Sequence, residues 1–292
     1  MNAIEVQNLC HRYKGKSVYE DLSFSVPRGS VCGLLGKNGQ GKTTLVNILM
    51  GFLKPVSGRC LVLGENSHNL SPSLRKRVGL LHEGHQAYEF MTIAQTETFF
   101  SRWYPDWNRD IFYDLVNRMD LSPGHKIRQM SCGQRSQVVL GVIMAQNPDL
   151  LILDDYSMGL DAGYRRLFLD VLHDFVAAGD KTVFVTSHIV QDLEQLVDTL
   201  LFLDQGRITQ TPLKDFMTSF KKFTFTAEKG QVLQKDTVIT GLEQRGNRIT
   251  LYTYGEMDDL KSHLAGLGIR PKDLQQSPMS LEDGFIGLMG KY

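Results

Sequence analysis

The sequence lacks a surplus of either charge, because its 32 lysines and arginines equal its 32 aspartates and glutamates. A general electrostatic attraction to DNA or RNA needs a basic excess, so this balance argues against nucleic acid as a partner. Long apolar runs are also missing, and the longest fall far short of the ~20 residues that a membrane helix needs. We therefore expect a soluble chain that acts on a membrane only through partners.

Cysteine is scarce, with four residues that are widely spread and form no CxxC pair: Cys10, Cys32, Cys60 and Cys132. This usage predicts reduced thiols in the cytosol. The first residues, Met1 to Glu5, do not have the pattern of a signal peptide, which agrees with a cytoplasmic location. With 292 residues, the chain is long enough for one large domain or two smaller ones, and it can bury a core.

The most informative segment runs from Gly36 to Thr44 and has the spacing of a phosphate-binding loop: a glycine, four residues, then Gly-Lys-Thr. A short apolar strand is expected before it, at residues 30–35. A helix is expected after it, at residues 44–50. A chance glycine-rich turn is the alternative, but strand, loop and helix in this order favour a nucleotide site.

The residue types of this loop suit a bound triphosphate. Glycines allow backbone N–H groups to point at the phosphates, and the helix N-terminus adds a partial positive charge. We expect Lys42 to reach the β and γ phosphates, Thr43 to ligate Mg²⁺ and Thr44 to support the α phosphate. The residues expected around the phosphates are Gly36, Lys37, Asn38, Gly39, Gln40, Gly41, Lys42, Thr43 and Thr44. Kinases, GTPases and transport ATPases share such a loop, so it does not identify the enzyme.

The remaining pattern predicts an α/β fold with additions. Alternating strands at residues 4–9 and 22–26 predict a small antiparallel layer, and apolar runs at 150–153 and 182–186 predict buried parallel strands. Helical spacing between residues 91 and 146 predicts a helical insertion, whose aromatic stripe is expected to lie in the core. Ser131 is the expected N-cap of its last helix.

From about residue 221 the pattern changes, with strands expected at 222–226 and 249–253 and a helix at 257–267. We interpret this region as a small α+β appendage, and nothing in it indicates chemistry.

Two aspartates, Asp154 and Asp155, follow the apolar run at 150–153. Sheets of this class bind ligands at the carboxyl ends of their strands, so one carboxylate can hold magnesium and the other can orient a water molecule. A solvated strand end is the alternative, which the upstream phosphate loop disfavours. His188 follows the strand at 182–186 on the same edge, and from the residues alone a structural and a functional role both stay open.

Two further features were weighed as sites. Tyr13 has an aromatic face that can stack on adenine, although a half-buried tyrosine at a strand end is the favoured alternative for the residue alone. The run His82-Glu83-Gly84-His85 suggests a metal site. Its spacing is not that of a helical zinc site and no third cluster lies nearby, so we do not expect one there.

Five motifs occur in a fixed order: the loop at 36–44, Met130 to Arg135, Leu150 to Asp155, Gly159 to Asp161 and Thr186 to His188. Together they resemble the nucleotide-binding subunit of ABC transporters over residues 1 to about 220. The chain looks most like the single-cassette ATPases of bacterial exporters, which often end in a segment like Ser280 to Phe285.

The resemblance implies a P-loop NTPase fold, with a RecA-like parallel sheet core, an N-terminal antiparallel β layer and a helical subdomain at about 88–146. It divides the chain into a cassette, 1–220, and a C-terminal accessory domain, 221–292. It implies an ATPase that uses ATP and Mg²⁺ and drives integral membrane permease subunits, with export as the expected direction. A second nucleotide-binding subunit is implied, with a homodimer expected and a heterodimer left open. The location would be cytoplasmic, on the inner face of the cell membrane.

The resemblance also implies residue roles. Tyr13 would stack on adenine, and Thr43, Asp154 and Glu83 would hold magnesium. Three residues would be catalytic: Lys42, Asp155 at the base position and His188 at the γ-phosphate switch. Three residues of the signature segment would contact ATP held by the other subunit: Ser131, Gly133 and Gln134. Asp161 would lie in the dimer-contact loop.

Several positions depart from the family pattern. Asp155 replaces a glutamate, which moves the carboxylate back by on the order of 1.5 Å, and a misplacement of about 1 Å can cost around a hundredfold in rate. Cys132 replaces a glycine and would be strained only at positive φ. Glu83 replaces a glutamine and keeps an oxygen ligand. Tyr156 and Ser157 replace Pro-Thr.

These departures leave two alternatives, a hydrolysing motor subunit and an ATP-gated switch with little or no turnover. A cassette acting on DNA or ribosomes and a small-molecule kinase are disfavoured.

Overall fold

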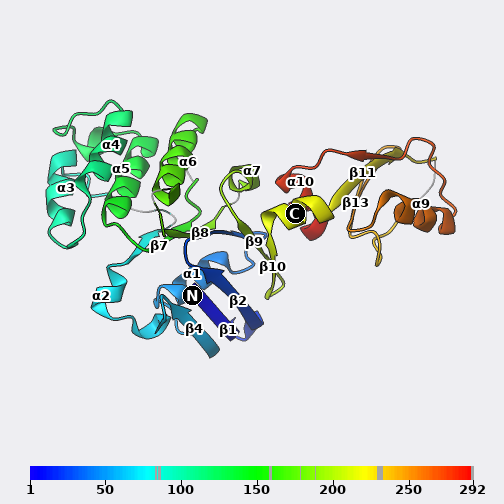
Figure 1. Ribbon diagram of the computed structural model, residues 1–292, viewed down its shortest axis with the longest axis horizontal. Coiled ribbons are helices and arrows are strands. Elements are labelled where there is room, and N and C mark those ends of the chain that lie inside the picture. The colour runs from blue at the N-terminus through cyan, green and yellow to red at the C-terminus, as the bar shows by residue number, and fades with distance from the viewer. Residues whose placement is uncertain are drawn as a thin grey trace.

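The computed structural model describes residues 1–82, 84, 87–157, 160–177, 179–187, 189–228 and 233–290. These residues form three sheets with helices packed around them (Figure 1). The predicted α/β architecture is confirmed: a central, mostly parallel sheet carries an antiparallel layer, a helical group and an α+β appendage.

The central sheet consists of β3 (Val31–Leu35), β6 (Val78–Leu81), β7 (Leu150–Asp154), β8 (Thr182–Thr186), β9 (Thr199–Asp204) and β10 (Arg207–Pro212). Its order is β10-β9-β3-β8-β7-β6, with only β10 antiparallel to its neighbour. Every residue of β3, β7 and β8 is buried, as expected for parallel strands covered on both faces.

The N-terminal layer consists of β1 (Asn2–Tyr13), β2 (Lys16–Pro27), β4 (Ser57–Val62) and β5 (Glu65–Asn66), in the order β2-β1-β4-β5. The helix α1 (Lys42–Leu49) lies between this layer and the central sheet, and its apolar side chains share one core with both. Burial of Leu45, Val46, Ile48 and Leu49 therefore fixes α1 at the end of β3.

The remaining helices before the appendage are α2 (Pro72–Arg75), α3 (Ile93–Ser101), α4 (Arg109–Arg118), α5 (Cys132–Ala145), α6 (Ala162–Ala177), α7 (Val190–Glu194) and α8 (Leu213–Ser219), with short 3₁₀ turns at Ser67–Asn69 and Ile127–Gln129. Helices α3, α4 and α5 form the predicted helical group, which has its own apolar core (Figure 1). The expected aromatic core is only half correct: Phe112 is buried, but Phe99 is 38% exposed.

The appendage consists of β11 (Lys221–Thr226), β12 (Gly241–Arg245), β13 (Arg248–Thr253), α9 (Met257–Gly266), β14 (Gln275–Ser277) and α10 (Leu281–Met289). Its four-stranded sheet has the order β12-β13-β11-β14, and α9 covers it with a separate core that includes Phe223, Ile249 and Leu260. Figure 1 shows this unit at one end of the molecule.

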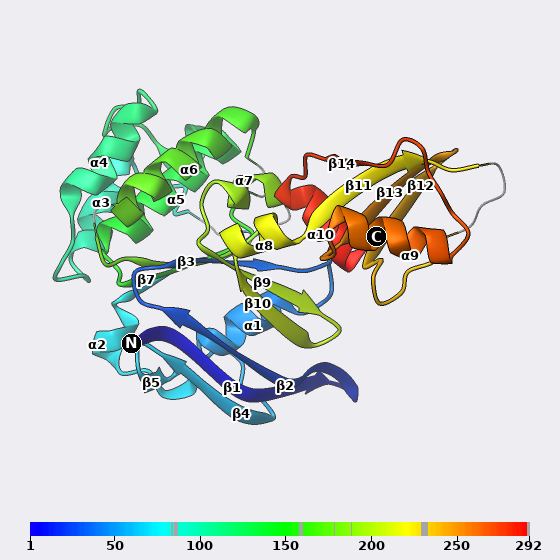
Figure 2. The ribbon, with the colours of Figure 1, turned by 45° about the vertical axis from the view of Figure 1, so that its right-hand side comes forward.

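Helix α10 connects the appendage to the rest of the chain. It lies between α7 and α8 on one side and the appendage sheet on the other (Figure 2). The backbone N–H of Leu281 donates to Glu194 at 2.9 Å, and Gln191 donates to Glu282 at 2.6 Å, so α7 is hydrogen-bonded to α10. In the described part of the chain, no helix is both long and apolar enough to cross a membrane.

Candidate active site

Glycines shape the phosphate loop between β3 and α1. Gly39 and Gly41 have positive φ angles of 78° and 105°, which favour glycine. A Cβ at Gly36 would lie 2.7 Å from the Leu203 carbonyl oxygen, and one at Gly41 would lie 2.7 Å from the Tyr19 hydroxyl. Tyr19 donates to the Gly41 carbonyl, and burial raises its pKa, so this hydroxyl stays protonated. The loop is therefore fixed by packing against β2 and β9.

Lys42 lies over this loop. Its Nζ donates to the Gly36 carbonyl at 2.6 Å and to the Lys37 carbonyl at 3.2 Å. The Gln40 side chain accepts the Gln205 N–H at 2.9 Å, which ties the loop to the turn between β9 and β10. The ammonium group thus lies against carbonyls of the loop that leads into α1, whose N-terminus favours an anion.

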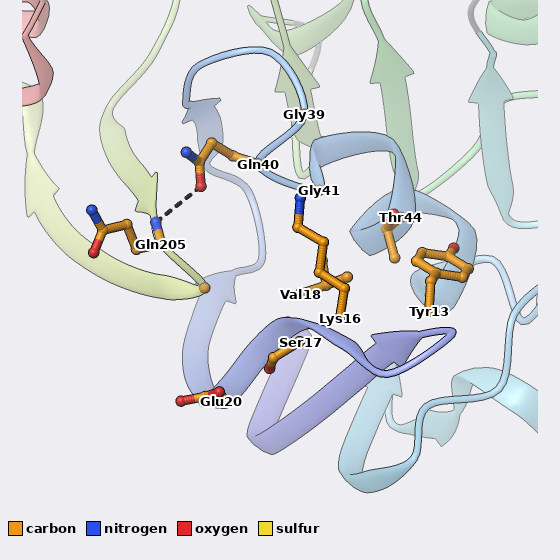
Figure 3. A pocket seen from close by; sticks show the side chains of 11 residues that line it. Tyr13, Lys16, Ser17, Val18, Glu20, Gly39, Gln40, Gly41, Thr44 and Gln205 are labelled. Carbon is orange, nitrogen blue, oxygen red and sulfur yellow. Dashed lines mark hydrogen bonds between the residues drawn. The ribbon is translucent and has the colours of Figure 1, made fainter.

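Beside the loop lies a hollow of about 520 Å³ (Figure 3). Its lining comprises Tyr13, Lys16, Ser17, Val18, Glu20, Gly39, Gln40, Gly41, Thr44, Gln205 and Gly206. Tyr13 is 47% exposed and its ring is edge-on to His11, with centroids 4.8 Å apart. Lys16 extends toward Gly41. The hollow therefore joins an aromatic face and a cation to the phosphate loop.

The paired carboxylates lie on the same edge of the sheet as the loop. Leu34, Thr186 and Asp154 occupy one row across the adjacent strands β3, β8 and β7. Neighbouring strands are about 4.8 Å apart, so Asp154 lies two strand spacings from Leu34, which precedes the start of the loop by two residues. The predicted meeting of these two motifs is a direct result of the strand order.

Asp154 is 1% exposed, yet only half of its carboxylate is satisfied. Its Oδ1 accepts a 2.9 Å hydrogen bond from the Thr186 hydroxyl, whereas its buried Oδ2 has no hydrogen-bond partner among the described residues. A buried carboxylate oxygen is costly to leave unpaired, and a cation satisfies it well. The donor set therefore fits a magnesium ion.

Asp155 follows β7 with a left-handed backbone, φ 49°. Its N–H donates to the Thr186 hydroxyl at 3.0 Å and to the Thr186 carbonyl at 3.2 Å. The Ser157 hydroxyl donates to Asp155 Oδ1 at 3.4 Å. Asp155 has a shorter side chain than the glutamate of the family pattern, and it lies in a backbone turn immediately after β7.

The signature segment begins α5. Ser131 is its N-cap as predicted, with Gln134 N–H donating to the Ser131 hydroxyl at 3.2 Å and the reciprocal bond at 3.0 Å. Cys132 has no positive φ, so the replacement of glycine causes no backbone strain. Ser131, Gly133 and Gln134 do not line the hollow beside the phosphate loop.

Two predicted site residues, Glu83 and His188, lie outside the described residues, as does Gly159. Asp161 accepts the Tyr164 N–H at 2.9 Å at the start of α6. Sequence reasoning missed Lys16, Glu20 and Gln205, which line the hollow. Only the hairpin of β1 and β2 and the turn after β9 bring them there, and no local motif signals this.

Comparison with known proteins adds a family to this geometry. Residues 19–157 match the family model described as "ABC transporter". The chain is 28% identical over 289 residues to "ABC transporter ATP-binding protein YtrB" of Bacillus subtilis (strain 168), covering 98% of both chains. It is 31% identical over 209 residues to "Nod factor export ATP-binding protein I" of Burkholderia orbicola (strain AU 1054), covering 70% of this chain and 68% of that one.

A solved structure described as "Structure of ATP binding subunit of ABC transporter" has the same fold, with a TM-score of 0.66, 23% identity and coverage of 74% of this chain and 92% of that chain. These comparisons support ATP hydrolysis and give no support to a switch without turnover. A phosphate loop, a buried carboxylate row and these relatives lead to one conclusion: the chain belongs to the ABC transporter family, as an ATP-binding and ATP-hydrolysing subunit that works with membrane components.

Proposed function

We propose that residues 36–44 hold Mg-ATP together with Asp154 and that Asp155 orients the attacking water. The observation that carries this proposal is the buried Oδ2 of Asp154, which has no hydrogen-bond partner within the described ranges and lies in one row with β3, the strand before the phosphate loop. Magnesium would be held by Asp154 and the Thr43 hydroxyl, with Glu83 as the further expected ligand. The ion would supply charge neutralisation of the phosphates.

Within one chain, Tyr13 and Lys42 would hold the two ends of the nucleotide. The open face of Tyr13 is available for stacking on adenine, and Lys42 would exchange its loop carbonyls for the β and γ phosphates. Lys37, Asn38, Gly39, Gln40 and Thr44 would complete the cradle. His188 would contact the γ phosphate.

A second nucleotide-binding subunit would complete each site. Ser131 lies at the N-terminus of a 14-residue helix, on a surface away from the hollow of its own chain. Its exposed cap, with Gly133 and Gln134, is suited to a phosphate that another subunit presents. We propose a head-to-tail dimer, with a homodimer as the expected form.

We further propose that the membrane partner is a permease that contacts an aromatic surface patch next to α3. Its members are Tyr88, Phe90, Phe99 and Trp103, of which Phe90 is 73% and Trp103 61% exposed. The ring of Tyr88 lies 5.9 Å from Phe90 and 5.6 Å from Phe99, so these three rings are contiguous, and Trp103 follows the C-cap of α3. Exposed aromatic clusters of this kind mark interaction sites. The chain would then be cytoplasmic, on the inner face of the membrane.

Export is the proposed direction, because a relative named for Nod factor export is 31% identical. We also propose that residues 1–220 form the cassette, with the helical subdomain at about 88–146, and that residues 221–292 form an accessory domain. The separate core of the appendage supports that boundary.

The experiment is ATP turnover by the complex isolated from membranes, at varied Mg²⁺ concentration. Lys42→Ala should lose ATP binding, and Asp154→Asn should keep ATP binding but lose the response to Mg²⁺. Trp103→Ala combined with Phe90→Ala should lower recovery with the permease, whereas Leu267→Ala, an exposed apolar residue of the appendage, should not. An unchanged Mg²⁺ response in Asp154→Asn would overturn the proposed metal ligand.

A further inference from the structure

Asp155 is followed by a tyrosine whose side chain is fixed in the core. Tyr156 is 2% exposed, and its ring stacks on Phe168 with centroids 4.5 Å apart and planes at 17°. Its hydroxyl donates to Asp192 Oδ2 at 2.9 Å. The residue next to the proposed water-orienting carboxylate is therefore held by both stacking and a buried hydrogen bond.

The carboxylate of Asp192 connects three elements of the structure. Asp192 is 8% exposed, lies on α7 and also faces Arg165, whose Nε is 3.4 Å away. Arg165 lies on α6, and its N–H donates to the Asp161 carbonyl at 2.9 Å. One acceptor thus connects the loop that joins β7 to α6, helix α6 itself and α7, the helix that follows β8.

Two buried serines provide a second contact, between the loop after β7 and the loop after β8. The hydroxyls of Ser157 and Ser187 lie 3.4 Å apart, and each residue is 3% exposed. Because Ser157 also donates to Asp155, the position of this carboxylate depends on the loop that Tyr156 anchors. A left-handed, non-glycine residue such as Asp155 persists only where its surroundings hold it.

We propose that Tyr156 and Asp192 are positioning residues for Asp155. Their hydrogen bond holds the loop after β7 so that the short carboxylate of Asp155 keeps one place relative to the phosphate loop. The inference rests on the role proposed above for Asp155. Neither Tyr156 nor Asp192 lines the hollow beside the phosphate loop, so both act through Asp155. The ABC transporter family commonly has a proline in place of Tyr156. A proline has no hydroxyl to make this hydrogen bond.

The tyrosine hydroxyl keeps its proton throughout the working range of pH. Burial, and then the charge of Asp192, raises the pKa of Tyr156 above its ordinary value. Loss of the hydroxyl should therefore lower kcat equally at every pH and leave the shape of the pH profile unchanged.

The appendage offers a matched control. Tyr252 is 1% exposed and its hydroxyl donates to Glu243 at 2.9 Å. It therefore forms a tyrosine–carboxylate hydrogen bond of the same length on β13, outside the sheet that carries Asp154. Tyr156→Phe and Tyr252→Phe each remove one buried hydroxyl and keep the ring. Their thermal unfolding, kcat and KM for ATP are compared in the same complex.

We expect both variants to unfold at similarly lowered temperatures. Tyr156→Phe should lower kcat about tenfold with KM for ATP within about twofold, because a misplacement of about 1 Å can cost a hundredfold and a smaller one costs less. Tyr252→Phe should keep the kcat of the unmodified chain. Equal kcat values for the two variants would overturn the inference.

Asp192→Asn and the double variant Tyr156→Phe/Asp192→Asn test whether the two residues act through their shared hydrogen bond. If Tyr156 acts through Asp192, the double variant should be no slower than the slower single variant, whereas multiplied losses would contradict the link. Asp155→Asn separates the two claims. If it retains turnover, the proposed role of Asp155 fails; if it is inactive while Tyr156→Phe is fully active, only the positioning role fails.

Discussion

The Thr186 hydroxyl donates a 2.9 Å hydrogen bond to Asp154 Oδ1, and both side chains are buried. The same hydroxyl accepts the N–H of Asp155 at 3.0 Å. One side chain of β8 therefore orients the proposed magnesium ligand and fixes the first residue after β7. The second oxygen of Asp154 has no hydrogen-bond partner in the part of the chain that the structure describes, and it is the one proposed to bind magnesium.

Thr186→Val keeps the side-chain shape and removes this hydroxyl. It leaves Asp154 Oδ1 unpaired, so we expect a loss of about 1–3 kcal/mol in the free energy of unfolding and a higher Mg²⁺ concentration for half-maximal turnover. The control is Thr182→Val on the same strand, where the hydroxyl accepts the Gly29 N–H at 3.0 Å. An equal shift of the Mg²⁺ requirement in both variants would show that Thr186 has only a structural role.

Cys132→Gly tests whether the cysteine that replaces a glycine in the signature segment affects turnover. Cys132 stands at the start of α5 without a positive φ, so glycine gains nothing from its conformational freedom there. We expect turnover to change less than about twofold and stability to fall by at most about 1 kcal/mol. A tenfold rise in phosphate release would mean that the cysteine side chain obstructs the site.

The reactivity of the same cysteine reports on the dimer. Cys132 is exposed, whereas Cys32 and Cys60 are buried, and burial raises the pKa of Cys32 to about 12 and of Cys60 to about 11. A thiol reagent should therefore label Cys132 and spare these two. In Asp155→Asn with ATP, a head-to-tail dimer should slow labelling of Cys132 and leave Cys10 unaffected. Unchanged labelling of Cys132 would contradict the proposed dimer.

The joint between α10 and the appendage is tested by a glycine pair. A Cβ at Gly287 would meet the ring of Tyr252, while one at Gly266, at the end of α9, would meet nothing within 4 Å. Gly287→Ala should lower the free energy of unfolding by about 1–3 kcal/mol. Gly266→Ala should leave it equal or raise it by up to about 1 kcal/mol. Urea unfolding followed by circular dichroism measures both free energies. Equal values would mean that the contact between α10 and the appendage sheet accepts an added methyl group without loss of stability.

Local pattern was enough to predict the inner strands and the N-cap of α5, whereas the helix expected at residues 44–50 begins at Lys42. The apolar run at 182–186 is β8, with the same bounds, because a strand buried on both faces needs continuous apolar side chains. Ser131 is the N-cap expected from its place before the helical pattern. Strand β10 was missed because most of its residues are exposed and show no apolar period; pairing with β9 makes it a strand.

The site was predictable only where its spacing is local. The phosphate loop and Asp154 could be recognised from the few residues that surround each of them. Gln205 reaches Gln40 across 165 positions, and Asp192 reaches Tyr156 across 36, so only the strand order brings these pairs together. The roles of all the site residues stay predictions, including those of Glu83 and His188, which lie outside the described residues.

The central claim is that this chain hydrolyses ATP with Asp155 as the residue that orients water. The most direct measurement is phosphate release by the intact complex with Mg²⁺, comparing the unmodified chain, Asp155→Asn and Lys42→Ala. We predict turnover in the unmodified chain, none in Asp155→Asn despite retained ATP binding, and neither turnover nor ATP binding in Lys42→Ala. Undiminished phosphate release by Asp155→Asn would contradict the role proposed for Asp155.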